Sequence, residues 1–306
     1  MLKSIWEDAK REFQYGNMVT RLILINLVVF LLVHVVKIIL YIGNGATPSG
    51  AFQQFLHFFS MSSDWKFVLT HPWTLVTSMF LHEGVWHILW NMIFLYWFGR
   101  IVGDFLGNRR VFPIYFMGGL AGVLFFYLSA NLLPYTGGME RFALGASGGV
   151  MAIVVAAGVI APDYIMRLLF LGDVKLKYIV FALVFLDLVG IGNDMNTGGH
   201  FAHLGGALMG WLMVSQLKAG IDWSQPINRI LTQLAGLFER KAKRPQVVFT
   251  NKNRASNRAN KSASRLAENL DRQEKVDAIL DKIKKSGYSS LSKEEKAFLF
   301  EASKED

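Results

Sequence analysis

The class of fold is decided by residues 19–42, VTRLILINLVVFLLVHVVKIILYI, because this stretch is long and apolar enough to cross the roughly 30 Å of hydrocarbon in a bilayer. The 306-residue chain is 52% hydrophobic and 18% charged, whereas a soluble domain is about a quarter charged. Five more apolar stretches follow: Val85–Val102, Phe112–Leu132, Gly145–Ala161, Tyr178–Ile191 and His200–Leu217. We therefore expect an all-α membrane protein with six transmembrane helices.

Positive charges predict how the six helices are oriented, since Lys and Arg favour the cytoplasmic side of a membrane. They cluster before the first stretch and after the second, fourth and sixth, whereas the other three loops carry only Lys66 and Arg141. This alternation predicts that both termini are cytoplasmic. The second, fourth and sixth helices then all begin at the outer side, so their first turns lie at similar depth.

Polar side chains gather in those first turns, where they are costly and so mark a functional site. They are His82, His87 and Asn91 around the start of the second helix, Ser147 at the start of the fourth, and His200 and His203 at the start of the sixth. The sequence therefore brings a serine, an asparagine and several histidines to one level of the bundle.

These residue types fit acyl transfer. Ser147 is a nucleophile if His203 takes its proton as general base. His87 and Asn91, with the free N–H groups at the start of the fourth helix, can stabilise the resulting oxyanion. No carboxylate is recognised beside His203, so we expect a dyad and interpret Asp187, about one turn from the outer end of the fifth helix, as having no catalytic role.

Glycines predict close contact between the fourth and sixth helices. Gly206 and Gly210 have the spacing that lets membrane helices approach closely. Gly148 and Gly149, together with Gly205 and Gly206, are expected to bring the serine and the histidine within hydrogen-bonding reach.

The sequence resembles the rhomboid family of intramembrane serine proteases over roughly residues 19–217. The likeness rests on Asn26, Trp73, His82, His87, Asn91-Met92, Gly145-Ala146-Ser147-Gly148 and Ala202-His203-Leu204-Gly205-Gly206. The resemblance implies a six-helix bundle with Ser147 and His203 as the catalytic dyad. It also implies that His87 and Asn91 help to hold the oxyanion, with His82 as an auxiliary group near the mouth of the site. Substrates would be single-span membrane proteins, cleaved in or near their helix.

Three positions depart from the family pattern. Thr74 follows Trp73 where the family often has arginine, which concerns contacts between the outer loop and lipid. Gly103, with Asp104 beside it, replaces a frequent acidic residue at the inner end of the second helix. Met151 stands four residues after the serine, where an aromatic residue often packs on the catalytic histidine.

Two other enzyme classes fit less well. A zinc protease motif needs histidines four residues apart, whereas His82 and His87 are five apart, and a zinc site built from His82, His200 and His203 is a remote alternative. Residues 145–149 also fit the G-x-S-x-G turn of soluble hydrolases. That turn requires a preceding strand, and no strand is evident in the sequence.

The chain after the sixth helix divides into two segments. Residues 218–265 are expected to form an amphipathic helix and a basic linker, whose nine Lys and Arg between 240 and 265 include no acidic neighbour. Such a cluster favours anionic lipid, although a solvated linker fits equally well, and nucleic-acid binding is not expected. Residues 266–306 are expected to form a small helical hairpin, in which Gly287 ends one helix and Ser292 begins a capping box.

We therefore expect a cytoplasmic segment (residues 1–18), a membrane domain (19–217), the basic tail and the hairpin. The expected function is a serine endopeptidase in a bacterial plasma membrane that cleaves single-span substrates near the outer face. A rhomboid-like protein without activity, which binds membrane proteins, is the alternative. No cofactor or metal is expected, and the absence of cysteine excludes thiolate chemistry.

Overall fold

The computed structural model describes residues 16–45, 47, 50–136, 141–169, 171–191, 196–238, 270–271, 273–287 and 290–302, with residues 7, 10, 11 and 13. The chain divides into two compact units, Met1–Phe238 and Glu239–Asp306. Most of the predicted N-terminal segment and the whole predicted basic stretch 240–265 lie outside the described residues.

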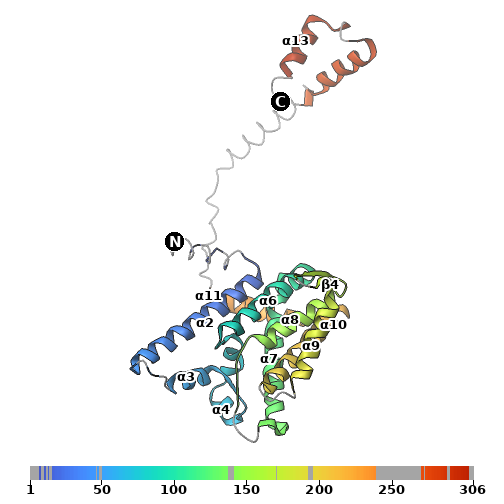
Figure 1. Cartoon of the computed structure of the whole chain (residues 1–306). Coiled ribbons are helices and arrows are strands. Elements are labelled where there is room, and N and C mark those ends of the chain that lie inside the picture. The colour runs from blue at the N-terminus through green and yellow to red at the C-terminus, as the bar shows by residue number, and fades with distance from the viewer. Residues whose placement is uncertain are drawn as a thin grey trace. The chain divides into compact units, whose positions relative to one another are not determined.

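The first unit is helical, as the sequence predicts, and each of the six apolar stretches forms a helix (Figure 1). These helices are α2 (Met18–Gly43), α6 (Val85–Leu106), α7 (Asn108–Leu132), α8 (Ser147–Ile160), α9 (Leu176–Gly190) and α10 (Thr197–Lys218). The N-terminus of α2 is capped by Asn17, whose side chain accepts a hydrogen bond from the Thr20 N–H.

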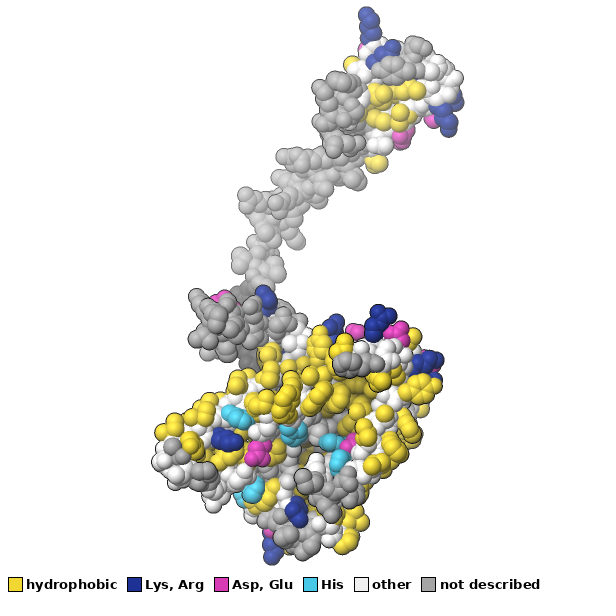
Figure 2. All heavy atoms as spheres, in the orientation of Figure 1, with side chains coloured by type: hydrophobic (Ala, Val, Ile, Leu, Met, Phe, Trp, Pro, Cys, Tyr) yellow, Lys and Arg dark blue, Asp and Glu magenta, His cyan; other side chains and the backbone are white. Residues whose placement is uncertain are grey.

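Two of these helices, α2 and α7, are long and apolar enough to cross a membrane. Helix α8 is apolar but shorter, and the count of six spans stays a prediction. Apolar side chains are also exposed along α2 and α9, for example Leu31, Ile39, Phe181 and Leu186. Figure 2 shows hydrophobic side chains over much of one face of this unit. A surface of this kind is suited to lipid and not to water.

Helix α8 lies inside the bundle, packed against α6, α7 and α10 (Figure 1). Its residues from Gly148 to Ala157 are all buried. A Cβ atom on Gly206 would overlap the Gly148 carbonyl, and one on Gly210 would overlap the Ala152 carbonyl. The predicted packing role of Gly206 and Gly210 is therefore confirmed.

The two other glycines of the predicted pairs face a different neighbour. A Cβ on Gly149 would lie 2.6 Å from the Tyr115 carbonyl oxygen, and one on Gly205 would lie 2.6 Å from the Ala121 carbonyl oxygen. Both acceptors belong to α7. The glycine pairs therefore bring three helices together, because adjacent residues point to different sides of a helix.

The long connection between α2 and α6 is folded onto the bundle. It contains α3 (Ala51–Phe59), β1 (Met61–Ser62), α4 (Trp65–Thr70), α5 (Thr74–Thr77) and the 3₁₀ turn η1 (Ser78–Phe80). A second 3₁₀ turn, η2 (Pro134–Thr136), follows α7. The Trp73 indole donates a hydrogen bond of 2.8 Å to the Phe58 carbonyl, which ties the connection to itself.

A short sheet joins this connection to the residues ahead of α8. Strand β1 pairs antiparallel with β2 (Phe142–Ala143). The expectation that no strand precedes Ser147 is therefore wrong, since strands of two residues are too short to leave a hydrophobic alternation in the sequence. The described residues contain a second two-stranded sheet, in which β3 (Ile165–Leu168) pairs antiparallel with β4 (Gly172–Lys175). Neither sheet is the parallel sheet of a soluble hydrolase.

A buried hydrogen-bond chain links α2, α7 and η1. The Asn26 amide donates to the Leu22 carbonyl at 2.8 Å and to the Tyr115 hydroxyl at 3.4 Å. Tyr115, which is fully buried, donates in turn to the Met79 carbonyl at 3.0 Å. Buried polar groups need such partners, so this chain fixes η1 against the bundle.

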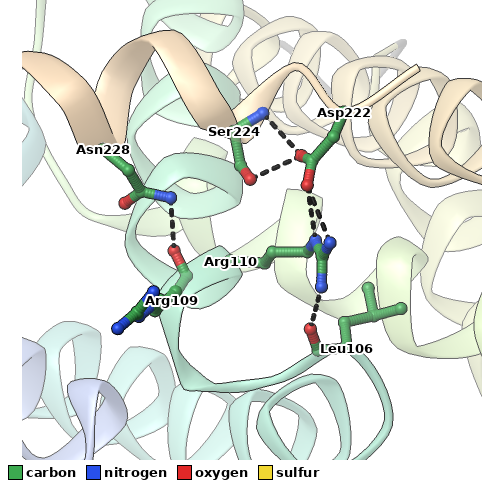
Figure 3. Close-up of polar contacts among 6 residues, drawn as sticks. All are labelled: Leu106, Arg109, Arg110, Asp222, Ser224 and Asn228. Atoms are coloured by element: carbon green, nitrogen blue, oxygen red, sulfur yellow. Dashed lines mark hydrogen bonds and ion pairs between the residues drawn. The ribbon is translucent and has the colours of Figure 1, made fainter. Parts of the chain in front are cut away.

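Helix α11 (Ser224–Phe238) is anchored to the start of α7 by a polar cluster (Figure 3). Arg110 donates from Nε and Nη2 to one Asp222 carboxylate oxygen at 3.0 and 2.7 Å. The other Asp222 oxygen accepts from the Ser224 hydroxyl and N–H at 2.5 and 2.9 Å. The Asn228 amide donates to the Arg109 carbonyl at 3.1 Å. The predicted helix after residue 217 is confirmed, and the cluster caps its N-terminus.

The second unit contains the predicted helical hairpin. Residues 273–286 are helical, Gly287 follows with a φ of 78°, and α13 (Lys293–Ala302) completes the pair. The capping box is confirmed: the Glu295 N–H donates to the Ser292 hydroxyl, and the Ser292 N–H donates to the Glu295 carboxylate. Lys282 joins the two helices through an ion pair of 2.8 Å with Glu295.

The contact between α8 and α10 predicts that Gly206→Ala destabilises the bundle. The added methyl group would overlap the Gly148 carbonyl, and overpacking of this kind costs about 1–3 kcal/mol. The midpoint of thermal unfolding in detergent should therefore fall. Gly236→Ala in α11 is the matched control, because a Cβ there meets no atom within 4 Å. A midpoint for Gly206→Ala at or above that of the wild type would contradict the packing.

The Asp222 cluster predicts a pH-dependent contribution to stability. Burial raises the pKa of Asp222, but hydrogen bonds from Ser224 and Arg110 outweigh it and hold the pKa below its usual value. Because the pKa of Asp222 is lower in the folded state than the unfolded-state value of about 3.9, the charged carboxylate stabilises the fold at pH values above 3.9. This stabilisation is lost as the pH falls through the folded-state pKa. Asp222→Asn should lower the free energy of unfolding by about 1–2 kcal/mol at pH 7. The loss should lie near the smaller value, because the Arg110 side chain is 35% exposed.

The measurement is the difference in unfolding midpoint between wild type and Asp222→Asn from pH 7 down to pH 3, and this difference should shrink at the acid end. Asp173→Asn is the control, because its ion pair with Arg167 is exposed and should contribute little. A difference that stays constant with pH would rule out the charged form of Asp222 as its source.

Candidate active site

The loop ahead of Ser147 is held by two hydrogen bonds from its backbone N–H groups. Gly145 has a φ of 135°, which other residues rarely adopt, and its N–H donates to the Ser78 carbonyl at 2.8 Å. The Ala146 N–H donates to the His82 ring at 3.4 Å. Ser147 is the first residue of α8, so the N–H groups of the first turn around it have no partner within the helix.

Ser147 lines a cavity of about 810 Å³. His87 and Asn91 reach this cavity from α6, and His203 reaches it from α10. The structure therefore brings four of the five predicted site residues to one cavity, from three helices. Their chemical roles are not visible in this arrangement alone and stay a prediction.

His82 is the one predicted site residue that does not line the cavity. It is fully buried. Its ring accepts from the Ala146 N–H, and its centroid lies 5.0 Å from that of His87. The expectation that His82 sits at the mouth of the site is therefore wrong. His82 lies in the segment that precedes α6, and its ring packs against the loop ahead of Ser147.

His87 and Asn91 approach the serine from the side of α6. A Cβ on Gly145 would lie 2.9 Å from the His87 Nε2 atom and 3.7 Å from the Ser147 hydroxyl oxygen. Any side chain at residue 145 would therefore displace His87. The Asn91 amide donates to the His87 carbonyl at 2.9 Å. An amide nitrogen carries two hydrogens, so one N–H of Asn91 is left for a ligand in the cavity.

The dyad prediction missed a carboxylate. The Asp187 Oδ1 atom lies 2.7 Å from the His203 Nδ1 atom and 2.8 Å from the His200 Nδ1 atom. The interpretation that no carboxylate is placed beside His203 is therefore wrong. Asp187 is the only acidic residue of α9, and an isolated acid within an apolar helix is itself a functional signal. The sequence does not show which side of α9 faces α10, so the contact of Asp187 with His203 could not be predicted.

Among the described residues, one group could hold a metal ion. It consists of Asp187, His200 and His203, whose ligand atoms all lie within 4.8 Å of one another. The zinc alternative considered from the sequence used His82 instead. His82 lies outside this group, since its ring is occupied by the serine loop.

Comparison with protein families gives two matches. A model of the Rhomboid domain family matches residues 69–218, which include every residue of the cavity named above. A family of unknown function (DUF6576) matches residues 267–305, the helical hairpin of the second unit.

Individual proteins show the same likeness. The chain is 31% identical over 159 residues to RHOMBOID-like protein 12, mitochondrial, of Arabidopsis thaliana, covering 48% of this chain and 47% of that protein. It is 32% identical over 143 residues to Presenilin-associated rhomboid-like protein A, mitochondrial, of Danio rerio, covering 44% and 35%. It is 28% identical over 150 residues to Rhomboid protein 1, mitochondrial, of Saccharomyces cerevisiae, covering 48% and 42%. The chain thus spans less than half of each of these relatives.

These relatives, and others from Arabidopsis thaliana, are named as mitochondrial or chloroplastic proteins. The prediction of a bacterial plasma membrane is therefore wrong, and the assignment of both termini to a cytoplasm falls with it. The reason is that the charge pattern indicates sidedness and carries no information on which membrane is crossed. The matched domain and the relatives together show that the chain belongs to the rhomboid family.

Proposed function

We propose that this chain is an intramembrane serine endopeptidase with Ser147 as nucleophile and His203 as general base. The observation that carries the proposal is that both side chains line one cavity, although they come from different helices. A hydroxyl becomes a strong nucleophile only beside a base that takes its proton. At about 810 Å³ the cavity also has room for the water that hydrolysis of an acyl-enzyme would require.

His87 and Asn91 are proposed to stabilise the oxyanion, together with the N–H groups at the start of α8. Donors placed before the reaction stabilise the transition state more than the substrate. The proximity of the His87 ring to the serine loop supports this role. His82 is proposed to act only through that loop, because its ring receives the Ala146 N–H.

Single-span membrane proteins are the proposed substrates. The cavity wall includes Trp86 and Trp90 of α6 and Leu186 of α9, all exposed apolar side chains. A substrate helix in the bilayer offers a matching apolar surface. A domain of six spans would place this wall in contact with lipid, so that substrate can enter sideways from the membrane.

The relatives' names favour an organellar membrane for this protein, and we propose that location. Anionic lipid is the proposed partner of the basic stretch 240–265, whose nine positive charges would gain about 1 kcal/mol each near such a surface.

The first test is covalent labelling of the purified protein in detergent with a serine-directed fluorophosphonate, and cleavage of a reporter with one transmembrane helix. The wild type should be labelled at Ser147 alone and should cleave the reporter. Ser147→Ala should abolish both signals, and it should keep the unfolding midpoint because the substitution removes only one oxygen. Ser290→Ala, in the second unit, is the matched control and should behave as the wild type.

The alternative is a rhomboid-like protein without activity. It would be supported if the wild type neither reacts with the probe nor cleaves the reporter, yet binds single-span membrane proteins in the same detergent.

The proposed oxyanion site gives a second test. Asn91→Ala should lower kcat about 10²-fold or more, the usual effect of removing one oxyanion donor, with a small change in KM. Asn228→Ala is the matched control, because its amide contacts the Arg109 carbonyl away from the cavity. If Asn91→Ala raises KM and leaves kcat unchanged, Asn91 binds substrate and does not stabilise the transition state.

A further inference from the structure

We propose that Asp187 is a positioning residue that holds His203 for catalysis, and that His200 holds Asp187 in turn. The site would then be a Ser–His–Asp arrangement carried by α8, α10 and α9. The inference rests on the proposed serine protease function, which assigns the base role to His203.

The first step is the contact of 2.7 Å between the Asp187 Oδ1 atom and the His203 Nδ1 atom. A neutral imidazole carries one N–H group. When Nδ1–H donates to the carboxylate, the Nε2 atom has no hydrogen and can accept the proton of a hydroxyl. The carboxylate also fixes the ring orientation and stabilises the positive charge that forms when the proton arrives. Asp187 therefore sets the tautomer and orientation of the His203 ring and stabilises its protonated form, as a general base requires.

The second step is the contact of 2.8 Å between the same Asp187 oxygen and the His200 Nδ1 atom. One carboxylate oxygen has two lone pairs and can accept from both rings. The two rings lie 6.0 Å apart and nearly perpendicular, at 84°, so they approach the oxygen from different directions. This second donor keeps the carboxylate from rotating away from His203.

The surroundings of Asp187 add a third argument. Its side chain is 11% exposed, and an acid on an apolar helix costs free energy unless it is paired. Gly190, one turn further along α9, leaves the room that the His200 ring occupies, because a Cβ there would overlap the ring. The buried position of Asp187 on α9 and the room that Gly190 leaves for the His200 ring of α10 both support the pairing of this carboxylate with the histidines.

A metal ion fits these distances less well. Two ligand atoms of one tetrahedral zinc ion lie roughly 3.3 Å apart when each bond is about 2.0 Å. The two separations in this cluster are 2.7 and 2.8 Å, which are the lengths of direct hydrogen bonds.

The experiment compares the full-length wild type with Asp187→Asn, Asp187→Glu, His200→Ala and Asp163→Asn. It measures the rate of fluorophosphonate labelling at Ser147, kcat and KM for the reporter, and the unfolding midpoint. Asp187→Asn should lower the labelling rate and kcat by about 10²- to 10⁴-fold with KM unchanged. Asp187→Glu should recover part of this loss, and His200→Ala should lose less than Asp187→Asn. Asp163→Asn, an exposed carboxylate paired with Lys175 and Lys177, should match the wild type.

Each other outcome has a defined meaning. If the wild type is labelled and Asp187→Asn labels equally fast, Asp187 has no part in catalysis while the proposed function stands. If the slow variant also unfolds earlier and Asp187→Glu is no better, Asp187 is structural and the inference fails. If a zinc chelator stops the wild type, the cluster is a metal site and the inference also fails. A wild type without labelling or cleavage overturns the proposed function itself.

Discussion

The close contact between α8 and α10 is the constraint on which the rest of the site depends. It exists because Gly206 and Gly210 leave no side chain between the two backbones at Gly148 and Ala152. Lipid gives membrane helices little hydrophobic reason to associate, so packing of small residues has to supply the attraction. The same contact brings the segment that carries Ser147 next to the segment that carries the histidines. Packing and chemistry are therefore set by the same few glycines.

The cavity is the second requirement of the proposed function, because hydrolysis would need water inside an apolar bundle. Two of the predicted site residues that line it hold hydrogen bonds within the protein, as buried polar groups generally do. Asn91 is paired with its own helix, and His203 is paired with Asp187. Pairing of this kind fixes each side chain before a substrate arrives. Fixed donors and acceptors are what distinguish a catalytic pocket from a merely wet one.

The sequence predicted the helices well, because apolar length and glycine spacing are local properties. All six apolar stretches are helices, and the capping box at Ser292 forms as its pattern indicates. The short pairing of β1 with β2 was missed, since two residues leave no periodicity to recognise. The contact of Asp187 with His203 was also missed, because it depends on how α9 is rotated against α10, and the sequence of one helix does not carry that information. His82 was misplaced because its contact with the loop ahead of Ser147 joins residues 64 positions apart in the chain.

The pairing of β1 with β2 has a consequence for inhibition. Met61 lies opposite Ala143, four residues before the serine, so the segment between α3 and α4 is bonded directly to the serine loop. Met61, Phe142 and Ala143 also line the cavity, so a compound that separates these two strands would act at the cavity wall and shift the loop that carries Ser147. In the proposed peptidase, such a compound would reduce turnover by displacing the proposed nucleophile.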